Sequence, residues 1–263
     1  MVAAGLYGGR GVNFLIGKAL GMGFSILSRC AVPIIAAALI IYVLPFIAYY
    51  YTVEMPMGYV DDGFRSWVEM PTVGMPKLVL GLIIDAVSKI IFITVMVAAG
   101  RDEHASFASV FKALGNKFLT MLGIIITSNL LIITAAIFFV IPGIYVALIL
   151  SVVLPVAVIE NRGIDGSLRR SGDLTRNQRW RLLGFFMIVG VILIGVAALL
   201  FTPIEFLLDG GTIPLLTSAL PVFNLLSEAV ISVLLTAFTV SAYLRLRDLK
   251  EGHRPETVAE IFA

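Results

Sequence analysis

The stretch LLGFFMIVGVILIGVAALLF, residues 182–201, contains no charged side chain. About 18 or more consecutive apolar residues are enough for an α-helix to cross the hydrocarbon core of a membrane. This stretch therefore predicts a transmembrane helix, and it raises the expectation that the rest of the chain belongs to a membrane as well.

The composition of the whole chain supports that expectation. Its 263 residues are 59% hydrophobic and 14% charged, whereas about 25% charged residues are typical of a soluble domain. Further apolar runs predict an all-α, polytopic membrane protein that forms a single domain over residues 1–263. The six predicted spans cover residues 30–51, 77–100, 118–140, 144–159, 182–207 and 218–243.

The basic residues predict how these spans are oriented. Almost all of the 19 lysines and arginines fall on one side of the six predicted spans, and Lys89 lies inside the second span. Short loops that are rich in lysine and arginine stay in the cytoplasm. We therefore expect both termini to be cytoplasmic.

Three amphipathic segments precede the first, third and fifth spans on the predicted cytoplasmic side. In SFASVFKALGNK, residues 106–117, the apolar side chains recur at helical spacing and form one face. Basic amphipathic helices of this kind lie in the membrane interface. We expect three interfacial helices, and a possible threefold repeat of interfacial helix, span and return span. The repeat units cover residues 11–100, 101–160 and 161–245, and a cytoplasmic tail follows at 246–263.

The region 141–184 contains a recognisable set of residues, and YLR at 243–245 fits the same pattern. The set is IPGIY at 141–145, Pro155, Glu160, SLRRS at 167–171, LT at 174–175 and WRLLG at 180–184. In these residues the chain resembles the membrane-domain family named after its fusion with glycerophosphoryl diester phosphodiesterase. The resemblance implies a multi-pass protein of the bacterial cytoplasmic (inner) membrane. The fused enzyme needs a separate barrel of about 250 residues, which we do not expect here. The sequence departs from the family at Asn177-Gln178-Arg179.

No catalytic pattern is visible in the sequence. The two histidines, His104 and His253, have no acid or nucleophile at a recognised spacing, and the GxxxxGK[ST], HExxH and GxSxG patterns do not occur. We therefore expect a protein that is not an enzyme and uses no cofactor. The methionines of the first outer loop have no histidine or cysteine beside them, so no metal site is expected either.

Three charged side chains lie inside predicted spans. Asp85 and Lys89 are four residues apart in the order that favours a helical ion pair, and Glu228 lies at a comparable depth in the sixth span. A charge at the bilayer centre costs at least about 2.5–3.5 kcal/mol, so such groups pair internally or serve a function. Two interpretations stay open: a structural ion pair beside a neutral Glu228, or a proton-linked relay.

The segment between the fourth and fifth spans predicts a short helix. Asp165 and Arg169 have the spacing of a helical ion pair, and Ser171 followed by glycine suits a helix end. Thr175 with Gln178 then forms a capping box that opens the fifth span.

The same segment, residues 159–181, is rich in arginine. Arg176 and Arg179 fall at the positive end of the predicted helix, where an anion should compensate their charge. Basic pockets on the cytoplasmic side can bind anionic headgroups, although topology and nonspecific attraction to lipid explain the cluster as well. No nucleic acid is expected, because the loop is short and flush with the membrane. The candidate headgroup residues are Arg169, Arg170, Arg176, Arg179, Trp180 and Arg181.

These features predict a non-catalytic membrane protein that acts through association with phospholipids, most of all anionic ones, or with another membrane complex. Its role would be that of a scaffold or accessory protein. The alternative is a proton-linked carrier or channel for a small molecule or lipid, built on Asp85, Lys89 and Glu228.

Overall fold

The computed structural model describes residues 14–43, 45, 48, 75–100, 107–209 and 214–251. Within these ranges every regular element is a helix. Six helices are long and apolar enough to cross a membrane, which confirms the prediction of an all-α chain with six helices of spanning length. These six candidate spans are Ile16–Tyr42, Leu78–Ala99, Val110–Phe138, Val140–Glu160, Arg179–Leu200 and Leu226–Glu251.

Several of these spans consist of more than one helical element. The elements in chain order are α1 (Ile16–Ala38), the π-helix η1 (Leu39–Val43), α5 (Met75–Gly100), α6 (Phe107–Phe138), α7 (Val140–Leu150), α8 (Val153–Glu160), α9 (Gly163–Thr175), α10 (Arg179–Asp209) and α11 (Pro214–Glu251).

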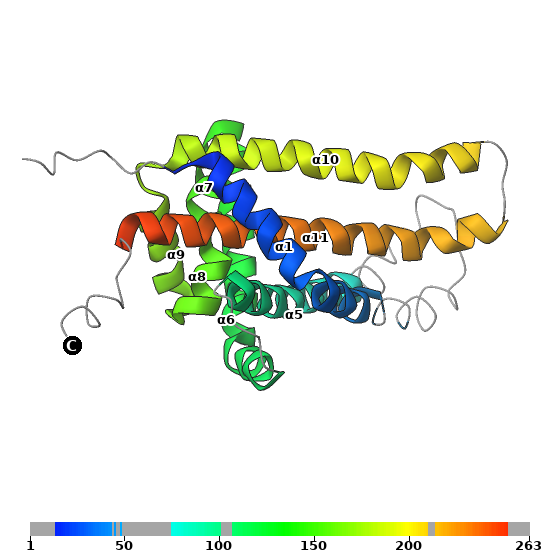
Figure 1. Ribbon diagram of the computed structural model, residues 1–263, viewed down its shortest axis with the longest axis horizontal. Coiled ribbons are helices and arrows are strands. Elements are labelled where there is room, and N and C mark those ends of the chain that lie inside the picture. The colour runs from blue at the N-terminus through cyan, green and yellow to red at the C-terminus, as the bar shows by residue number, and fades with distance from the viewer. Residues whose placement is uncertain are drawn as a thin grey trace, which may run out of the picture.

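The helix α11 is central to the arrangement. Figure 1 shows α10 and α11 side by side along the long axis, with α1 crossing α11 obliquely. The helices α6 and α7 pack against each other and cross the direction of α10 and α11 steeply, near the end where α10 begins and α11 ends. The helices α8 and α9 lie at that same end. The side of a membrane that this end faces stays a prediction, as does the threefold repeat.

The first span begins earlier than predicted, at Ile16 rather than at residue 30. The predicted start coincides with a kink in α1, where Cys30 has φ −118° and ψ 17°. Pro33 explains the kink, since it has no N–H to donate and its ring clashes with the carbonyl four residues before it. The predicted boundary between the interfacial segment and the first span therefore falls at the kink that separates the two helical parts of α1.

The predicted boundary before the third span is also absent, because α6 runs without interruption from Phe107 to Phe138. Gly115 and Asn116, near the end of the amphipathic segment, cost a helix about 1 kcal/mol or less each. The apolar residues on both sides outweigh that cost. The predicted segment before the fifth span is a separate helix, α9, while the one before the third span is continuous with its span.

The fourth span is broken between α7 and α8. Pro155 cannot donate a hydrogen bond to the carbonyl of Ser151, and Val152 leaves helical geometry with φ −113° and ψ 13°. The carbonyl of Ile149 near the break accepts a hydrogen bond of 2.6 Å from the hydroxyl of Ser171 in α9. Broken helices in a membrane need such partners for their freed backbone groups. Helix α9 therefore stabilises the break.

Candidate functional site

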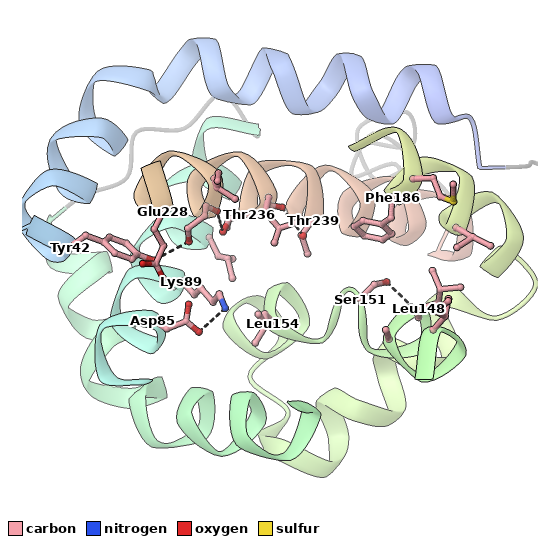
Figure 2. A pocket seen from close by; sticks show the side chains of 18 residues that line it. Tyr42, Asp85, Lys89, Leu148, Ser151, Leu154, Phe186, Glu228, Thr236 and Thr239 are labelled. Atoms are coloured by element: carbon pink, nitrogen blue, oxygen red, sulfur yellow. Dashed lines mark hydrogen bonds and ion pairs between the residues drawn. The ribbon is translucent and has the colours of Figure 1, made fainter. Parts of the chain in front are cut away.

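A cavity of about 770 Å³ lies among α5, α7, α8, α10 and α11 (Figure 2). Most of its wall is apolar, but one end is polar and is lined by Tyr42, Asp85, Lys89, Glu228 and Ser232. Ligand sites in proteins have this size and this composition, a mostly apolar wall with a few polar groups. This cavity is the candidate functional site.

The three charged residues predicted inside the spans come together at that polar end, and we call Asp85, Lys89 and Glu228 the inner cluster. Lys89 Nζ lies 2.7 Å from Asp85 Oδ2 on α5, which confirms the predicted helical ion pair. Glu228 faces the same cavity from α11 (Figure 2). Within the described part of the chain, its side chain makes no ion pair or hydrogen bond.

Tyr42 links three elements beside the inner cluster. Its hydroxyl lies 3.0 Å from the hydroxyl of Ser88 in α5 and 3.0 Å from that of Ser232 in α11. The ring is almost fully buried and stacks on Phe92. The sequence analysis missed Tyr42, because one tyrosine in an apolar run does not reveal its partners.

A polar stripe follows one face of α11. Its members are Glu228, Ser232, Thr236 and Thr239, and all four line the cavity. Their spacing of four, four and three residues keeps them on one helical face, over about 16 Å of helix axis. The hydroxyls of the two threonines donate to backbone carbonyls within α11 at 2.7 and 2.8 Å, so their lone pairs remain free as acceptors. The sequence contains this periodicity, and a search for polar residues at helical spacing would have found it.

A second hollow, of about 500 Å³, opens beside the first. The two hollows share the side chains of Ile144 and Leu148 from α7 and of Leu183 from α10. The two hollows therefore adjoin each other between these helices, and we call them together the α7–α10 groove. The outer end of the groove is lined by Tyr145, Asn177, Arg179 and Trp180.

Arg179 is the first residue of α10 and stands at the outer end of the groove. Its guanidinium carbon lies 4.6 Å from the centroid of the Tyr145 ring, and it donates a hydrogen bond to the hydroxyl of Tyr145. No carboxylate of the described residues pairs with Arg179, and its Nε has no hydrogen-bond partner among them. Trp180 beside it is 85% exposed. Arg179 is thus a cation at the positive end of a helix, as predicted, and it has no acidic partner among the described residues.

The predicted helix end and capping box before α10 are wrong. Helix α9 continues past Ser171 to Thr175, and the hydroxyl of Thr175 donates back to the carbonyl of Ser171 at 3.0 Å. The side chain of Gln178 accepts a hydrogen bond from the backbone N–H of Phe14, at 3.1 Å. The chain turns instead at Asn177, whose φ of 69° is a left-handed conformation that asparagine tolerates. Both predicted capping residues are occupied by other partners.

The structure does not gather the candidate headgroup arginines into one site. Arg169 forms the predicted pair with Asp165 at 3.0 Å, and both side chains are exposed. Arg181 donates to the backbone carbonyl of Phe14 at 3.4 Å. Arg176 follows α9 and is exposed, without an ion pair among the described residues. Of the candidate headgroup arginines, only Arg179 lines the groove.

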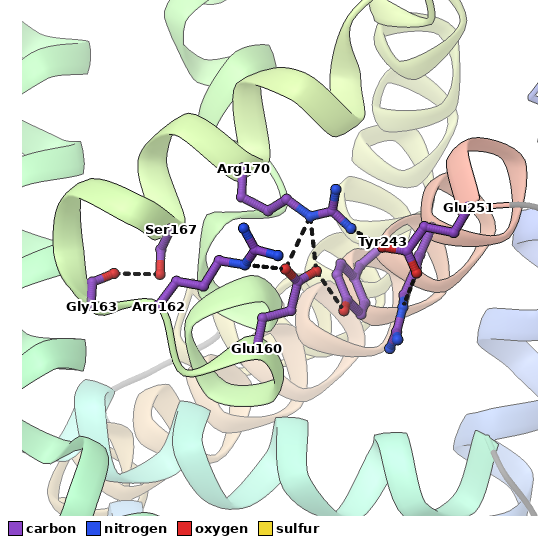
Figure 3. Close-up of polar contacts among 8 residues, drawn as sticks. Glu160, Arg162, Gly163, Ser167, Arg170, Tyr243 and Glu251 are labelled. Carbon is purple, nitrogen blue, oxygen red and sulfur yellow. Dashed lines mark hydrogen bonds and ion pairs between the residues drawn. The ribbon is translucent and has the colours of Figure 1, made fainter.

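Arg170 belongs to a separate polar network centred on Glu160 (Figure 3). Glu160 accepts hydrogen bonds from Arg170 Nε at 3.0 and 3.1 Å and from the hydroxyl of Tyr243 at 3.2 Å, and Arg162 Nε lies 2.8 Å away. Arg170 also donates to Glu251. Burial alone would lower the pKa of Arg170, but the hydrogen bond and charge of Glu160, together with Glu251, raise it above its ordinary value. The network joins α8, α9 and α11.

A family model supports the membrane assignment. The family described as the membrane domain of glycerophosphoryl diester phosphodiesterase matches residues 117–257, more than half of the chain. The chain belongs to this family. No curated protein and no solved structure matches it.

The matched region of this family member begins in α6 and takes in α7 to α11. It contains both walls of the α7–α10 groove, the Glu160 network and the polar stripe of α11. The pair of Asp85 and Lys89 on α5 lies before the matched region. Within the matched region, Glu228 is therefore the acid of the inner cluster.

The residues that carry the resemblance have physical roles in the structure. A Cβ added at Gly143 would lie 2.8 Å from the Cβ of Ala136, so glycine permits the close contact between α6 and α7. Tyr145 contacts Arg179, and Ser171 bonds the broken fourth span. Glu160 is the centre of the polar network. The residues that carry the resemblance therefore pack helices together or form hydrogen bonds, around the groove and at the end of the molecule where α9 lies.

Proposed function

We propose that this family member is a non-catalytic integral membrane protein that binds the anionic headgroup of a phospholipid at the outer end of the α7–α10 groove. The observation that carries the proposal is the position of Arg179, which has no carboxylate partner among the described residues, in a hollow that adjoins a large, mostly apolar cavity. We further propose that it resides in the bacterial cytoplasmic membrane with both termini in the cytoplasm, and acts there as an accessory protein.

The charge at the start of α10 favours an anion. The first turn of a helix has unpaired N–H groups and a positive dipole end, so Arg179, the first residue of α10, adds positive charge where the backbone is already positive. Arg176, which was predicted in the same turn, is instead the C-cap of α9. No acid of the described residues compensates either side chain. A phosphate would accept hydrogen bonds from a guanidinium, while Trp180 suits the interface between lipid and water.

The apolar walls favour a ligand with a hydrocarbon chain. Ile144, Leu148 and Leu183 line both hollows, so a chain that enters beside Arg179 stays in apolar contact as it passes inward. The family description adds chemical support, since a glycerophosphoryl diester contains the same kind of anionic phosphodiester as a phospholipid headgroup. Both ends of such a lipid would therefore meet a matching surface.

A carrier for a small molecule or lipid is the second candidate function. The inner cluster favours this function. Asp85 and Lys89 pair with each other, but both of them and Glu228 also line the cavity, where they could contact a substrate. The carrier hypothesis predicts flux into proteoliposomes that depends on these residues. Lipid binding at Arg179 with no flux would leave the accessory role as the function.

Native mass spectrometry in a neutral detergent tests the lipid proposal. Arg179→Gln is expected to lose co-purified phosphatidylglycerol, whereas the matched control Arg169→Gln is expected to retain it. The control removes an arginine from the same segment, but one that is exposed and paired with Asp165. Equal retention of phosphatidylglycerol by the two variants would contradict the proposal.

A further inference from the structure

The inner cluster has a surplus of negative charge. Asp85 and Lys89 pair with each other at 2.7 Å, which leaves Glu228 without a cation among the described residues. The cluster lies in a mostly apolar cavity between helices of spanning length. An isolated charge in such a setting is costly, so a cation is expected to accompany it.

The surroundings of Glu228 offer acceptors as well as charge. Ser232 lies one helical turn along the same face of α11, and its hydroxyl is 3.0 Å from that of Tyr42. Hydroxyl and carboxylate oxygens together can accept several hydrogen bonds from one donor group. A primary ammonium has three N–H donors, and a carboxylate with neighbouring hydroxyls matches that number of donors.

The apolar wall decides what kind of cation fits. A metal ion such as Ca²⁺ needs six to eight oxygen ligands, and no group of three or more His, Cys, Asp or Glu that could hold a metal occurs in the described ranges. The cavity adjoins the hollow beside Arg179, and the side chains of Ile144, Leu148 and Leu183 border both. A ligand that reaches Glu228 through this groove gains apolar contact if its cation is attached to a hydrocarbon chain.

We infer that the inner end of the cavity is a second binding site, at which Glu228 binds the ammonium group of an amine-bearing amphiphile whose chain lies in the α7–α10 groove. Asp85 and Lys89 form the fixed polar floor of this site, and Ser232 and Tyr42 supply hydroxyl acceptors. This site shares the groove with the proposed function, but it binds a cation beside Glu228, whereas the proposed function places an anion beside Arg179. The two assignments can therefore fail separately.

Thermal unfolding in a neutral maltoside detergent tests this site with dodecylamine as the probe and dodecanol as its neutral match. Dodecylamine is expected to raise the melting temperature in a concentration-dependent way, and dodecanol to raise it less. Glu228→Gln should weaken dodecylamine binding by about tenfold or more, as expected when a hydrogen bond between two charged groups is lost. Asp165→Asn removes an exposed carboxylate that lines neither hollow, and it should leave dodecylamine binding unchanged.

Two results would overturn the inference. The first is equal stabilisation by dodecanol and dodecylamine, a comparison that needs no variant and so stands even if Glu228→Gln does not fold. The second is unchanged dodecylamine binding in a folded Glu228→Gln protein. Glu228→Asp keeps the charge and is expected to keep the preference for the amine over the alcohol. Loss of that preference in Glu228→Asp would likewise count against a site defined by this charge.

Discussion

Replacing Glu160 with glutamine would keep the shape of the side chain but remove the charge that Arg162 and Arg170 share. Glu160 and Arg170 are only 10% and 17% exposed, so their charges are well removed from water. Breaking a buried ion pair by removing one partner costs about 3–5 kcal/mol, because the other charge is left uncompensated. Glu251 still contacts Arg170, and the amide oxygen of glutamine still accepts a hydrogen bond. We therefore expect a loss of about 2–4 kcal/mol in the free energy of unfolding.

Asp165→Asn is the matched control, since it breaks an arginine–carboxylate pair in the same helix. That pair is exposed, with 76% of the Asp165 side chain and 78% of the Arg169 side chain accessible. Exposed pairs contribute about 0–1 kcal/mol. Unfolding in mixed detergent micelles at increasing dodecyl sulfate measures both variants. A Glu160→Gln protein no less stable than Asp165→Asn would refute the reasoning that this network joins α8, α9 and α11.

Two further substitutions test the packing around the broken fourth span. Ser171→Ala leaves the carbonyl of Ile149 without its partner and should lower the free energy of unfolding by about 1–3 kcal/mol. Ser167 is equally buried but bonds within its own helix, so Ser167→Ala should lower the free energy of unfolding by less. A larger loss in Ser167→Ala than in Ser171→Ala would contradict the role of Ser171 at the break. Gly143→Ala forces α6 and α7 apart and should lower the free energy of unfolding by about 1–3 kcal/mol in the same assay. A methyl group added at Gly195 meets open space, so Gly195→Ala should be neutral or stabilising. Equal effects of the two substitutions would exclude a tight contact at Gly143.

The sequence predicts the helices well, because the length of an apolar run depends on local composition alone. Residues 182–201 lie within α10, and the pair of Asp85 and Lys89 forms at the predicted spacing. A single helical turn determines that pair, so no tertiary information is needed. The family residues at 141–145 also identified a segment that lines the groove.

The contacts between distant residues could not be predicted in this way. Thr175 and Gln178 have the pattern of a capping box, but each finds a better partner, one in α9 and one at Phe14. The arginine-rich segment reads as one patch, yet folding turns Arg170 toward Glu160 and leaves Arg179 at the groove. Identical side chains thus acquire different roles from the direction in which their helices present them.

The groove itself depends on how α7 and α10 are placed, which no local pattern encodes. Its existence can be tested most directly by electron cryomicroscopy of the protein in nanodiscs that contain phosphatidylglycerol. We predict lipid density between α7 and α10, with the phosphate beside Arg179 and the chain passing Ile144 and Leu183. A groove filled by the protein's own side chains, or ordered lipid at other faces and none here, would contradict the proposed function.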